Sequence, residues 1–396
     1  MTFPPRTVTL VLCRSDGTAL GALPPFAAPL PYWQDARDVT AGARRRHGID
    51  VTVLRLLFAA GPGPGGPVTY LAETADPAPD GLTPWLGDPA APHPLRLAYA
   101  KPGGPAADLA WALDRLAEAG IAVAGPAEQL RTWNLSAITS IPTARGPVWL
   151  KCVPAFFTHE GPLMQRLGST AVAPVISTDG TRTLMADVPG EDHYDADLTL
   201  RRRLLDQLHD LQARNVAHVD ALLALGLPDW RDDALRVAAE HVVATAGDGL
   251  ADAERRAIDS LLNTWAERFA QVRACGIPDT LVHGDLHPGN SRGAGERLVI
   301  LDWGDSGVGH PLLDASAFLA GVPETDAQIL RAQWAGLWRA TVPGCDPERA
   351  ADLLAPIAAL RHAVVYQGFL DRIEPDERIY HAHDPLDWLR RTAALA

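Results

Sequence analysis

The segment from Leu281 to Asp314 constrains this chain more than any other part of the sequence. It reads LVHGDLHPGN, SRGAGERLVI and LDWGDSGVGHPLLD, so a turn-rich loop is followed by a short apolar run that ends at an aspartate. Asp285 and Asn290 are separated by four residues, and Asp302 follows 17 positions after Asp285 (302 − 285). Three oxygen-bearing side chains on two adjacent turns suit the task of holding Mg²⁺ on a nucleotide while a carboxylate accepts a proton.

A lysine far upstream strengthens this hypothesis. Of the 35 basic residues only Lys101 and Lys151 are lysines. Lys151 lies in the run VWLKCV, which we predict to be a strand, and Glu160 begins a helical run nine residues later. A strand lysine that pairs with a glutamate on the next helix can hold nucleotide phosphates. Such a pair alone is more often a surface ion pair, and its position upstream of residues 281–314 favours the functional interpretation.

The motif HGDLHPGN, followed by a strand that ends in DWG, resembles the aminoglycoside phosphotransferase and choline kinase-like family over roughly residues 131–396. The resemblance implies that Asp285 is the catalytic residue, which orients the acceptor hydroxyl and accepts its proton. It implies that Asn290 and Asp302 bind Mg²⁺, and that Lys151 steadies the phosphates of ATP or GTP with Glu160 orienting it.

The same resemblance places a hinge in the segment LMADVPG. The nucleotide-contacting residues that it implies there are Leu184, Met185, Asp187 and Val188. Two departures argue against a protein kinase: Ser136 to Ser140, where a glycine-rich flap would lie, contains no glycine, and the metal-binding turn is DWG. His310 stands where the family commonly has aspartate, and we expect His283 to brace the catalytic loop by hydrogen bonds.

These patterns predict an α+β fold that is bilobal and protein-kinase-like, with an antiparallel-sheet N-lobe and a helical C-lobe, preceded by a small α/β domain. The predicted boundaries are 1–100 for the accessory domain, 101–130 for a linker helix, 131–190 for the N-lobe and hinge, and 191–396 for the C-lobe. Residues 131–144 and 148–153 predict one hairpin, and residues 172–177 and 182–188 a second. We expect a helix over 33–47 that is capped by Gly48.

The first hundred residues weakly resemble the Nudix hydrolase fold, through a strand, a helix that ends in RRRHGI and a further strand. Where that family uses metal-binding glutamates this chain has Gly42, Arg45 and Arg46, so the resemblance implies a catalytically degenerate domain. A generic α/β accessory unit is the alternative.

The net charge of −13 lies entirely beyond residue 100, because residues 1–100 carry eight arginines and eight acids. An acidic surface disfavours nucleic acid and would favour a cationic small molecule, but a solvated surface that keeps the protein soluble explains the charge better, since net charge alone says little about a site. We find no secretory leader and no apolar run of membrane length, so we expect a cytoplasmic protein that does not bind membranes. A homodimer stays open.

The predicted function is a small-molecule kinase that phosphorylates a hydroxyl of an aminoglycoside-, amine- or sugar-like acceptor, with a cationic acceptor among the alternatives. Two other functions stay open: a nucleotide-binding pseudokinase that regulates, and a peptide-directed kinase in natural-product maturation. Acidic residues near the C-terminus either bind amino groups of the acceptor or form a solvated cluster. They are Asp371, Glu374, Asp376, Glu377, Asp384 and Asp387.

Overall fold

The structure, a computed structural model, describes residues 3–396 and divides into two compact units. Unit 1 comprises Met1–Gly161, Val175–Asp187 and Leu370–Ala382. Unit 2 comprises Pro162–Pro174, Val188–Phe369 and His383–Ala396. Each unit is therefore assembled from segments that are far apart in the sequence.

The first sheet of unit 1 is built around β1 (Arg6–Cys13), whose second half is buried on both faces. Two apolar clusters enclose it, with Leu10 and Leu12 in one and Val11 and Cys13 in the other, which explains the unbroken apolar run. The other strands of this sheet are β2 (Ala19–Ala22), β3 (Phe26–Ala28), β4 (Thr52–Ala59) and β5 (Gly66–Glu73). β5 is parallel to β1 and antiparallel to β4.

The helix α1 (Arg37–His47) accompanies this first sheet. It ends at Gly48, whose φ of 69° lies in the left-handed region, and the N–H of Gly48 donates to the carbonyl of Arg44. Glycine tolerates this conformation because it has no Cβ. The predicted helix and its cap are therefore confirmed, although the helix begins four residues later than expected.

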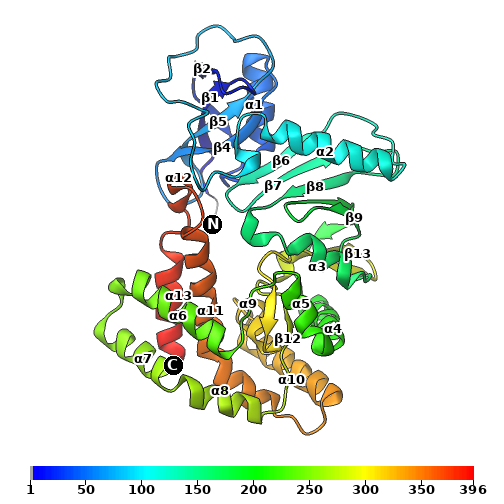
Figure 1. The fold of residues 1–396 in the computed structure, drawn as a ribbon, viewed down its shortest axis with the longest axis vertical. Helices are drawn as coiled ribbons and strands as arrows, with labels where there is room; N and C mark the ends of the chain where they lie inside the picture. Colours follow the sequence, from blue (N-terminus) through cyan, green and yellow to red (C-terminus); the bar gives the residue numbers. More distant parts are fainter. Residues whose placement is uncertain (1–2) are drawn as a thin grey trace. The chain divides into compact units, whose positions relative to one another are not determined.

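The second sheet of unit 1 is antiparallel, in the order β6-β7-β8-β10-β9 (Figure 1). Its strands are β6 (Glu128–Trp133), β7 (Ser136–Ile141), β8 (Val148–Cys152), β9 (Val175–Thr178) and β10 (Arg182–Ala186). The hairpin of β9 and β10 confirms the second predicted hairpin. The single strand predicted over 131–144 is wrong, because a turn at Asn134 and Leu135 divides it into β6 and β7.

The helix α2 (Gly104–Glu118) packs on this second sheet. Its buried residues Ala112 and Leu116 share one apolar cluster with Leu150, Cys152 and Leu184. Because side chains alternate along a strand, these three sheet residues point to the face opposite to Lys151. One face of the sheet is thus filled by α2, and the other carries the lysine.

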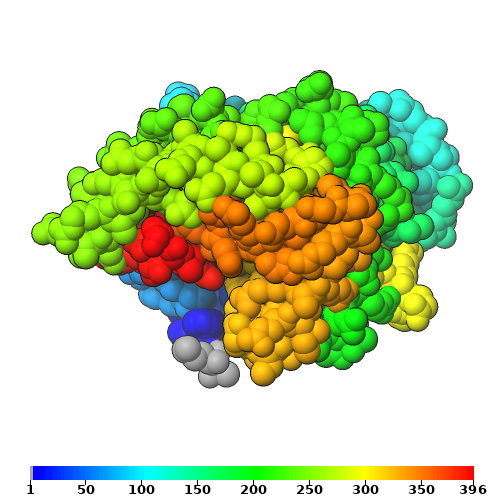
Figure 2. Space-filling model, turned by 90° about the horizontal axis from the view of Figure 1, so that it is seen from below, coloured from blue at the N-terminus to red at the C-terminus, as the bar shows by residue number. Residues whose placement is uncertain are grey.

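Unit 2 is mostly helical. Its helices are α4 (Leu198–Asn215), α5 (Val219–Ala224), α6 (Asp232–Ala246), α7 (Asp252–Asn263), α8 (Trp265–Ala274), α9 (Ala315–Phe318), α10 (Glu324–Thr341), α11 (Pro347–Leu370) and α13 (Asp384–Leu395). α13 packs against α6 and α7, and α10 packs against α4. Figure 2 shows α10 and the helices α6 to α8 on the outer surface of this unit.

α11 is long and apolar enough to cross a membrane by length and composition, contrary to the expectation that no such run exists. In the folded chain 67% of its most apolar window is buried inside the protein. Its middle also carries Arg361, which is fully buried. This burial is typical of a helix in a protein core.

Two small sheets in unit 2 hold the loops of the HGDLHPGN and DWG motifs. β12 (Thr280–Val282) pairs with β15 (Gly307–Gly309), and β11 (Glu191–Asp192) pairs with β13 (Ser291–Ala294), which pairs with β14 (Arg297–Ile300). The chain therefore passes from β12 through the HGDLHPGN loop into β13, and from β14 through DWG to β15.

Candidate active site

A β-hairpin brings Asn290 and Asp302 together. β13 and β14 are antiparallel, so Ser291 lies opposite Ile300. The N–H of Leu301 donates a 2.8 Å hydrogen bond to the carbonyl of Asn290, which extends the pairing by one residue. Asp302 comes next in the chain. The two predicted Mg²⁺ ligands therefore lie at the same end of one hairpin.

Asp302 has an unusual backbone conformation. Its φ is 60°, in the left-handed region, and it is the one non-glycine residue with a positive φ among residues 3–396. Such a conformation costs about 1–3 kcal/mol in a residue that has a Cβ, and it persists only where the surrounding structure imposes it. The turn after β14 is therefore a place where the fold holds a carboxylate under strain.

The loop that carries Asp285 turns sharply at Gly284. Gly284 has a φ of 92°, and a Cβ added there would lie 2.0 Å from the carbonyl oxygen of Asp305. No side chain fits so close to a backbone oxygen, so the glycine of the HGD motif is required by space as well as by conformation. The loop consequently lies directly against the segment that follows Asp302.

Asp314 fixes the backbone of this loop through hydrogen bonds. Its carboxylate accepts hydrogen bonds from the backbone N–H groups of His283 (3.0 Å) and Gly284 (2.7 Å) and from the side chain of Gln212 (2.9 Å). Arg361 donates to the carbonyl of Gly284. Burial raises the pKa of Asp314 to about 6, although these N–H donors and the charge of Arg361 lower it. A buried carboxylate and a buried guanidinium thus fix both polar groups of the turn.

His283 links the HGDLHPGN loop to the DWG turn. Burial lowers the pKa of His283 to about 4, so its ring is neutral at physiological pH. Nδ1 accepts from the N–H of Asp285 (3.3 Å), and a neutral ring must then carry its proton on Nε2, which donates to the carbonyl of Leu301 (3.0 Å). The ring also packs on Trp303, at 4.6 Å between centroids. The structure therefore confirms the predicted bracing role of His283.

Asp285 is held with its carboxylate partly accessible. The amide nitrogen of Asn290 donates to the backbone carbonyl of Asp285 (2.9 Å) and to its Oδ2 (3.2 Å), and His287 Nε2 lies 3.8 Å from the same oxygen. The side chain of Asp285 is 44% exposed. Burial raises the pKa of Asp285, His287 lowers it, and the charge of Asp302 raises it further. A carboxylate with a raised pKa is a better proton acceptor.

The residues present fit a magnesium ion. The amide nitrogen of Asn290 is engaged by Asp285, which leaves its amide oxygen for a cation. Asp285 and Asp302 repel each other, and a divalent cation would relieve that repulsion. In the described part of the chain no three His, Cys, Asp or Glu side chains form a metal-binding group. The cation would accordingly use one carboxylate, one amide and nucleotide phosphates, a set typical of Mg²⁺.

Unit 1 carries the predicted lysine–glutamate pair. Lys151 Nζ lies 2.7 Å from Glu160 Oε1, and their side chains are only 12% and 4% exposed. Lys151 is on β8, and Glu160 is the first residue of α3 (Glu160–Leu167). A pair this deeply buried differs from an ordinary surface ion pair, because removing one partner from a buried pair strongly destabilises the fold.

The start of α3 is fixed by close packing on β9 and β10. A Cβ added at Gly161 would lie 2.3 Å from the hydroxyl oxygens of both Thr178 and Thr183. These two hydroxyls are 3.0 Å apart and share a hydrogen bond. Thr183 also lies opposite Lys151 in the sheet. Gly161 thereby allows Glu160 to reach the lysine, a requirement that the sequence analysis did not identify.

The four predicted hinge residues have different environments. Leu184 is fully buried and packs with the cluster under α2, so its side chain points away from the Lys151 face. Met185 lies opposite Trp149 on the face of Lys151. Asp187 Oδ1 accepts a 2.8 Å hydrogen bond from the indole of that tryptophan. In unit 2, the carbonyl of Val188 accepts a 2.7 Å hydrogen bond from an arginine of β13.

The segment Ser136 to Ser140, where a protein kinase would have its glycine-rich flap, is strand β7. The turn is at Asn134 and Leu135, and the N–H of Asn134 donates a 2.6 Å hydrogen bond to Glu377. Glu377 also accepts from the N–H of Leu56, at 3.4 Å, and burial raises its pKa to about 7. The turn between β6 and β7 is therefore tied to the first sheet of unit 1 through one buried carboxyl group.

The C-terminal acidic residues do not form one exposed cluster. Glu374 pairs with Arg96 at 2.6 Å, and Asp387 pairs with Arg390 at 3.3 Å. Glu377 is buried and bound to backbone N–H groups. These contacts show that Glu374, Glu377 and Asp387 already have structural partners.

A cavity of about 370 Å³ opens beside Asp285 within unit 2. The HGDLHPGN loop contributes Asp285 and His287 to its wall, and the helices contribute Arg201 (α4), Tyr366 (α11) and Trp388 (α13). Helices remote in sequence meet at this point, and no local motif marks their contributions. The sequence analysis therefore singled out the HGDLHPGN part of this wall but not the part that the helices contribute.

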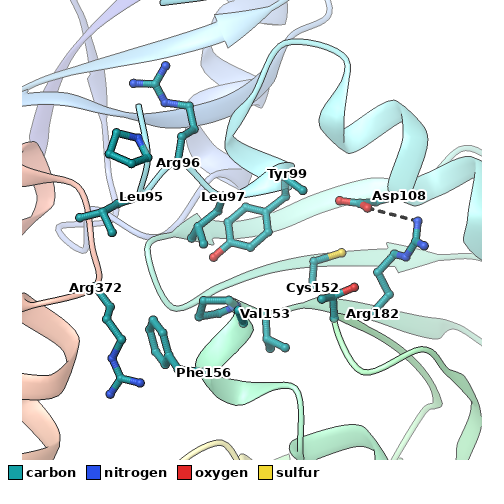
Figure 3. A pocket seen from close by; sticks show the side chains of 15 residues that line it. Leu95, Arg96, Leu97, Tyr99, Asp108, Cys152, Val153, Phe156, Arg182 and Arg372 are labelled. Carbon is teal, nitrogen blue, oxygen red and sulfur yellow. Dashed lines mark ion pairs between the residues drawn. The ribbon is translucent and has the colours of Figure 1, made fainter. Parts of the chain in front are cut away.

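A second cavity, of about 620 Å³, lies in unit 1 on the sheet face opposite to Lys151 (Figure 3). Its charged residues have partners: Arg182 lies 3.6 Å from Asp108, and Arg96 pairs with Glu374. None of the predicted reacting groups lines it. The cavity beside Asp285 is therefore the candidate acceptor site.

The model of the phosphotransferase enzyme family matches residues 159–363. A search of curated proteins finds no match. A candidate aminoglycoside phosphotransferase from Ralstonia eutropha is 16% identical, with a TM-score of 0.50 over 72% of this chain and 97% of that chain. This similarity shows the fold and confirms the predicted kinase-like α+β architecture.

Two further solved structures resemble the chain. The macrolide 2'-phosphotransferase MphH from Brachybacterium faecium is 20% identical, with a TM-score of 0.47 over 69% of this chain and 98% of that chain. An aminoglycoside 2'-phosphotransferase-IIIa in its GDP complex is 17% identical, with a TM-score of 0.47 over 72% of this chain and 98% of that chain.

Proposed function

This chain belongs to the phosphotransferase enzyme family, and from that premise we propose that it transfers the terminal phosphoryl group of ATP or GTP to a hydroxyl group of a small acceptor. The observation that carries the proposal is the convergence of Asp285, Asn290 and Asp302 beside a cavity of small-molecule size. The cavity of about 620 Å³ in unit 1 and the cavity between α10 and α11 are lined by none of these three residues.

Asp285 is the proposed catalytic base. Its exposed carboxylate faces the cavity, and its raised pKa favours acceptance of the hydroxyl proton. Phosphoryl transfer has a loose transition state, so the carboxylate acts chiefly by orienting the acceptor oxygen in line and takes the proton late. The bonds from Asn290 to Asp285 hold the carboxylate in place for this purpose.

Asn290 and Asp302 are the proposed ligands of Mg²⁺, through one amide and one carboxylate oxygen. When bound, the ion neutralises charge on the nucleotide phosphates. The hairpin of β13 and β14 sets the spacing of these two ligands, and His283 keeps that hairpin in register with the catalytic loop.

Lys151 is the proposed phosphate-binding cation, and Glu160 fixes its position. An ammonium group carries three N–H donors and can contact several oxygen atoms, which suits it to phosphate. Met185, which lies on the lysine's face of the sheet, and the backbone of Leu184, Asp187 and Val188 are the proposed contacts of the nucleotide base.

We further propose that the protein acts in the cytoplasm and binds neither nucleic acid nor membranes. The acidic surplus beyond residue 100 supports the exclusion of nucleic acid. The burial of α11 is consistent with the exclusion of membranes. A homodimer would change none of the residue assignments above.

The test is incubation with Mg-ATP or Mg-GTP and a panel of hydroxylated amines, sugars, acids and antibiotics, analysed by mass spectrometry. We expect nucleotide consumption that matches the appearance of an acceptor heavier by one phosphoryl group, and Asp302→Asn should abolish both. Tight nucleotide binding without any phosphorylated product would instead support the regulatory alternative. Labelling of a peptide by radioactive ATP would support the peptide-directed one.

A further inference from the structure

The wall of the cavity beside Asp285 is unexpectedly basic. The chain carries 48 acidic and 35 basic residues, yet the charged residues of this wall are Asp285, Arg201 and Arg391, beside two histidines. Asp285 is the one carboxylate among the lining residues of this cavity, and it is the proposed base. The wall therefore offers no second carboxylate that could bind a cationic group of the acceptor. Two acids lie close enough to affect residues of the wall. Burial lowers the pKa of Arg201, whereas the charge of Asp326 raises it. Burial raises the pKa of Tyr366, and so does the charge of Asp384. Neither acid lines the cavity.

Both arginines retain hydrogen-bonding capacity. Arg201 donates to the carbonyls of Ala196 (3.3 Å) and Phe318 (3.4 Å), which uses two of its five N–H groups. The guanidinium of Arg391 lies 4.9 Å from the ring centroid of Trp388. In the part of the chain that the structure describes, neither arginine forms an ion pair. Two such guanidinium groups attract carboxylate or phosphate and repel ammonium groups.

Aromatic rings form the remainder of the wall. Trp388 stacks on His362 at 4.2 Å between centroids and 19° between planes. Tyr194, which is 63% exposed, packs so closely on the loop that a Cβ at Gly289 would lie 2.5 Å from its ring. Flat side chains of this kind contact flat rings or apolar faces of a ligand.

His362 adds a polar atom that has no partner. The residue is 5% exposed, and its Nε2 is buried without a hydrogen bond among residues 3–396. Burial keeps the ring neutral by lowering its pKa well below the ordinary value. Buried polar groups are normally satisfied, so an unpartnered nitrogen in a cavity wall is a candidate contact for a ligand.

We propose that the acceptor is a compact hydroxylated molecule with a flat ring or apolar face and an anionic group, either carboxylate or phosphate. The anion pairs with Arg201 and Arg391, the flat face lies on Tyr194 and Trp388, and the hydroxyl is directed to Asp285. The cavity, near the lower end of the usual range for small-molecule sites, favours a single ring with its substituents. This inference rests on the proposed kinase function and replaces the cationic acceptor expected from net charge.

The test uses three matched probes: 4-(hydroxymethyl)benzoate, 4-(hydroxymethyl)benzyl alcohol and 4-(hydroxymethyl)benzylamine. Binding to the full chain is measured by calorimetry without nucleotide, and phosphorylation is measured separately with Mg-ATP. We expect the carboxylate to bind roughly tenfold or more tightly than the amine, as one charge-assisted contact predicts. Arg391→Gln and Arg201→Gln should each reduce this preference severalfold.

Arg390→Gln is the matched control. Arg390 is the neighbouring arginine on α13, pairs with Asp387 and does not line the cavity, so its substitution should leave the preference unchanged. Undetectable carboxylate binding, tighter binding of the amine, or a preference that survives both Arg201→Gln and Arg391→Gln overturns the inference. A carboxylate preference without phosphorylation of any acceptor would contradict the kinase function alone, and efficient phosphorylation of the amine would contradict this inference alone.

Discussion

Replacing Asp314 should destabilise the HGDLHPGN loop without removing any of the proposed reacting groups. Its carboxylate accepts from the N–H groups of His283 and Gly284 and from Gln212, all at 3.0 Å or less. Asp314→Ala leaves the two backbone donors buried and unsatisfied, at about 1–3 kcal/mol each, so the free energy of unfolding should fall by about 2–6 kcal/mol. Arg361, which is also fully buried, loses a neighbouring negative charge in the same variant.

The assay is urea denaturation followed by circular dichroism, together with the rate of phosphoryl transfer. Asp314→Asn is the matched variant, because its amide oxygen can keep one acceptor while its NH₂ group opposes another donor. We therefore expect a loss of stability between those of the wild type and Asp314→Ala. The reasoning is refuted if Asp314→Ala unfolds within about 0.5 kcal/mol of the wild type, the range of ordinary surface substitutions.

Three further substitutions test separate parts of the account. Lys151→Met removes the cation that pairs with the buried carboxylate of Glu160. The free energy of unfolding should fall by about 3–5 kcal/mol and phosphoryl transfer should be almost completely lost, whereas Lys151→Arg should keep the fold in thermal melts. Gly161→Ala pushes a Cβ into two threonine hydroxyls, and the resulting shift of Glu160 should raise KM for the nucleotide with little change for the acceptor. The carboxyl of Glu377 has a pKa of about 7 against an ordinary 4.5. The folded state therefore holds a proton that the unfolded chain has lost, so the free energy of unfolding should fall by about 3 kcal/mol as the pH rises from 4.5 to 7. Glu377→Gln should flatten that slope in urea denaturations at pH 5 and 8.

The features that could be predicted from the sequence are those whose residues lie close together in the chain. The HGDLHPGN loop and the DWG turn are joined by one short hairpin, so the neighbourhood of Asn290 and Asp302 could be predicted from a local motif. Lys151 and Glu160 are nine residues apart, so the strand and the helix that carry them could also be predicted from local patterns. The division of residues 131–144 into two strands was missed because the turn at Asn134 and Leu135 contains no glycine to mark it.

The acceptor cavity could not be predicted in this way. Its wall combines Tyr194, Arg201, His362 and Trp388, from segments whose pairing depends on how the helices of unit 2 pack. No periodicity or spacing connects these positions. Net charge pointed to a cationic acceptor because it averages over the whole surface, whereas the sign of a binding site depends on a few side chains.

The central claim is that Asp285 is the base of a phosphoryl transfer, and Asp285→Asn tests it most directly. Asparagine keeps the shape of the side chain and removes the proton acceptor. Calorimetry should show nucleotide binding within about threefold of the wild type, while the rate of acceptor phosphorylation falls by a factor on the order of 10²–10⁴. A variant that transfers phosphate at the wild-type rate would contradict the assignment of Asp285 as the base.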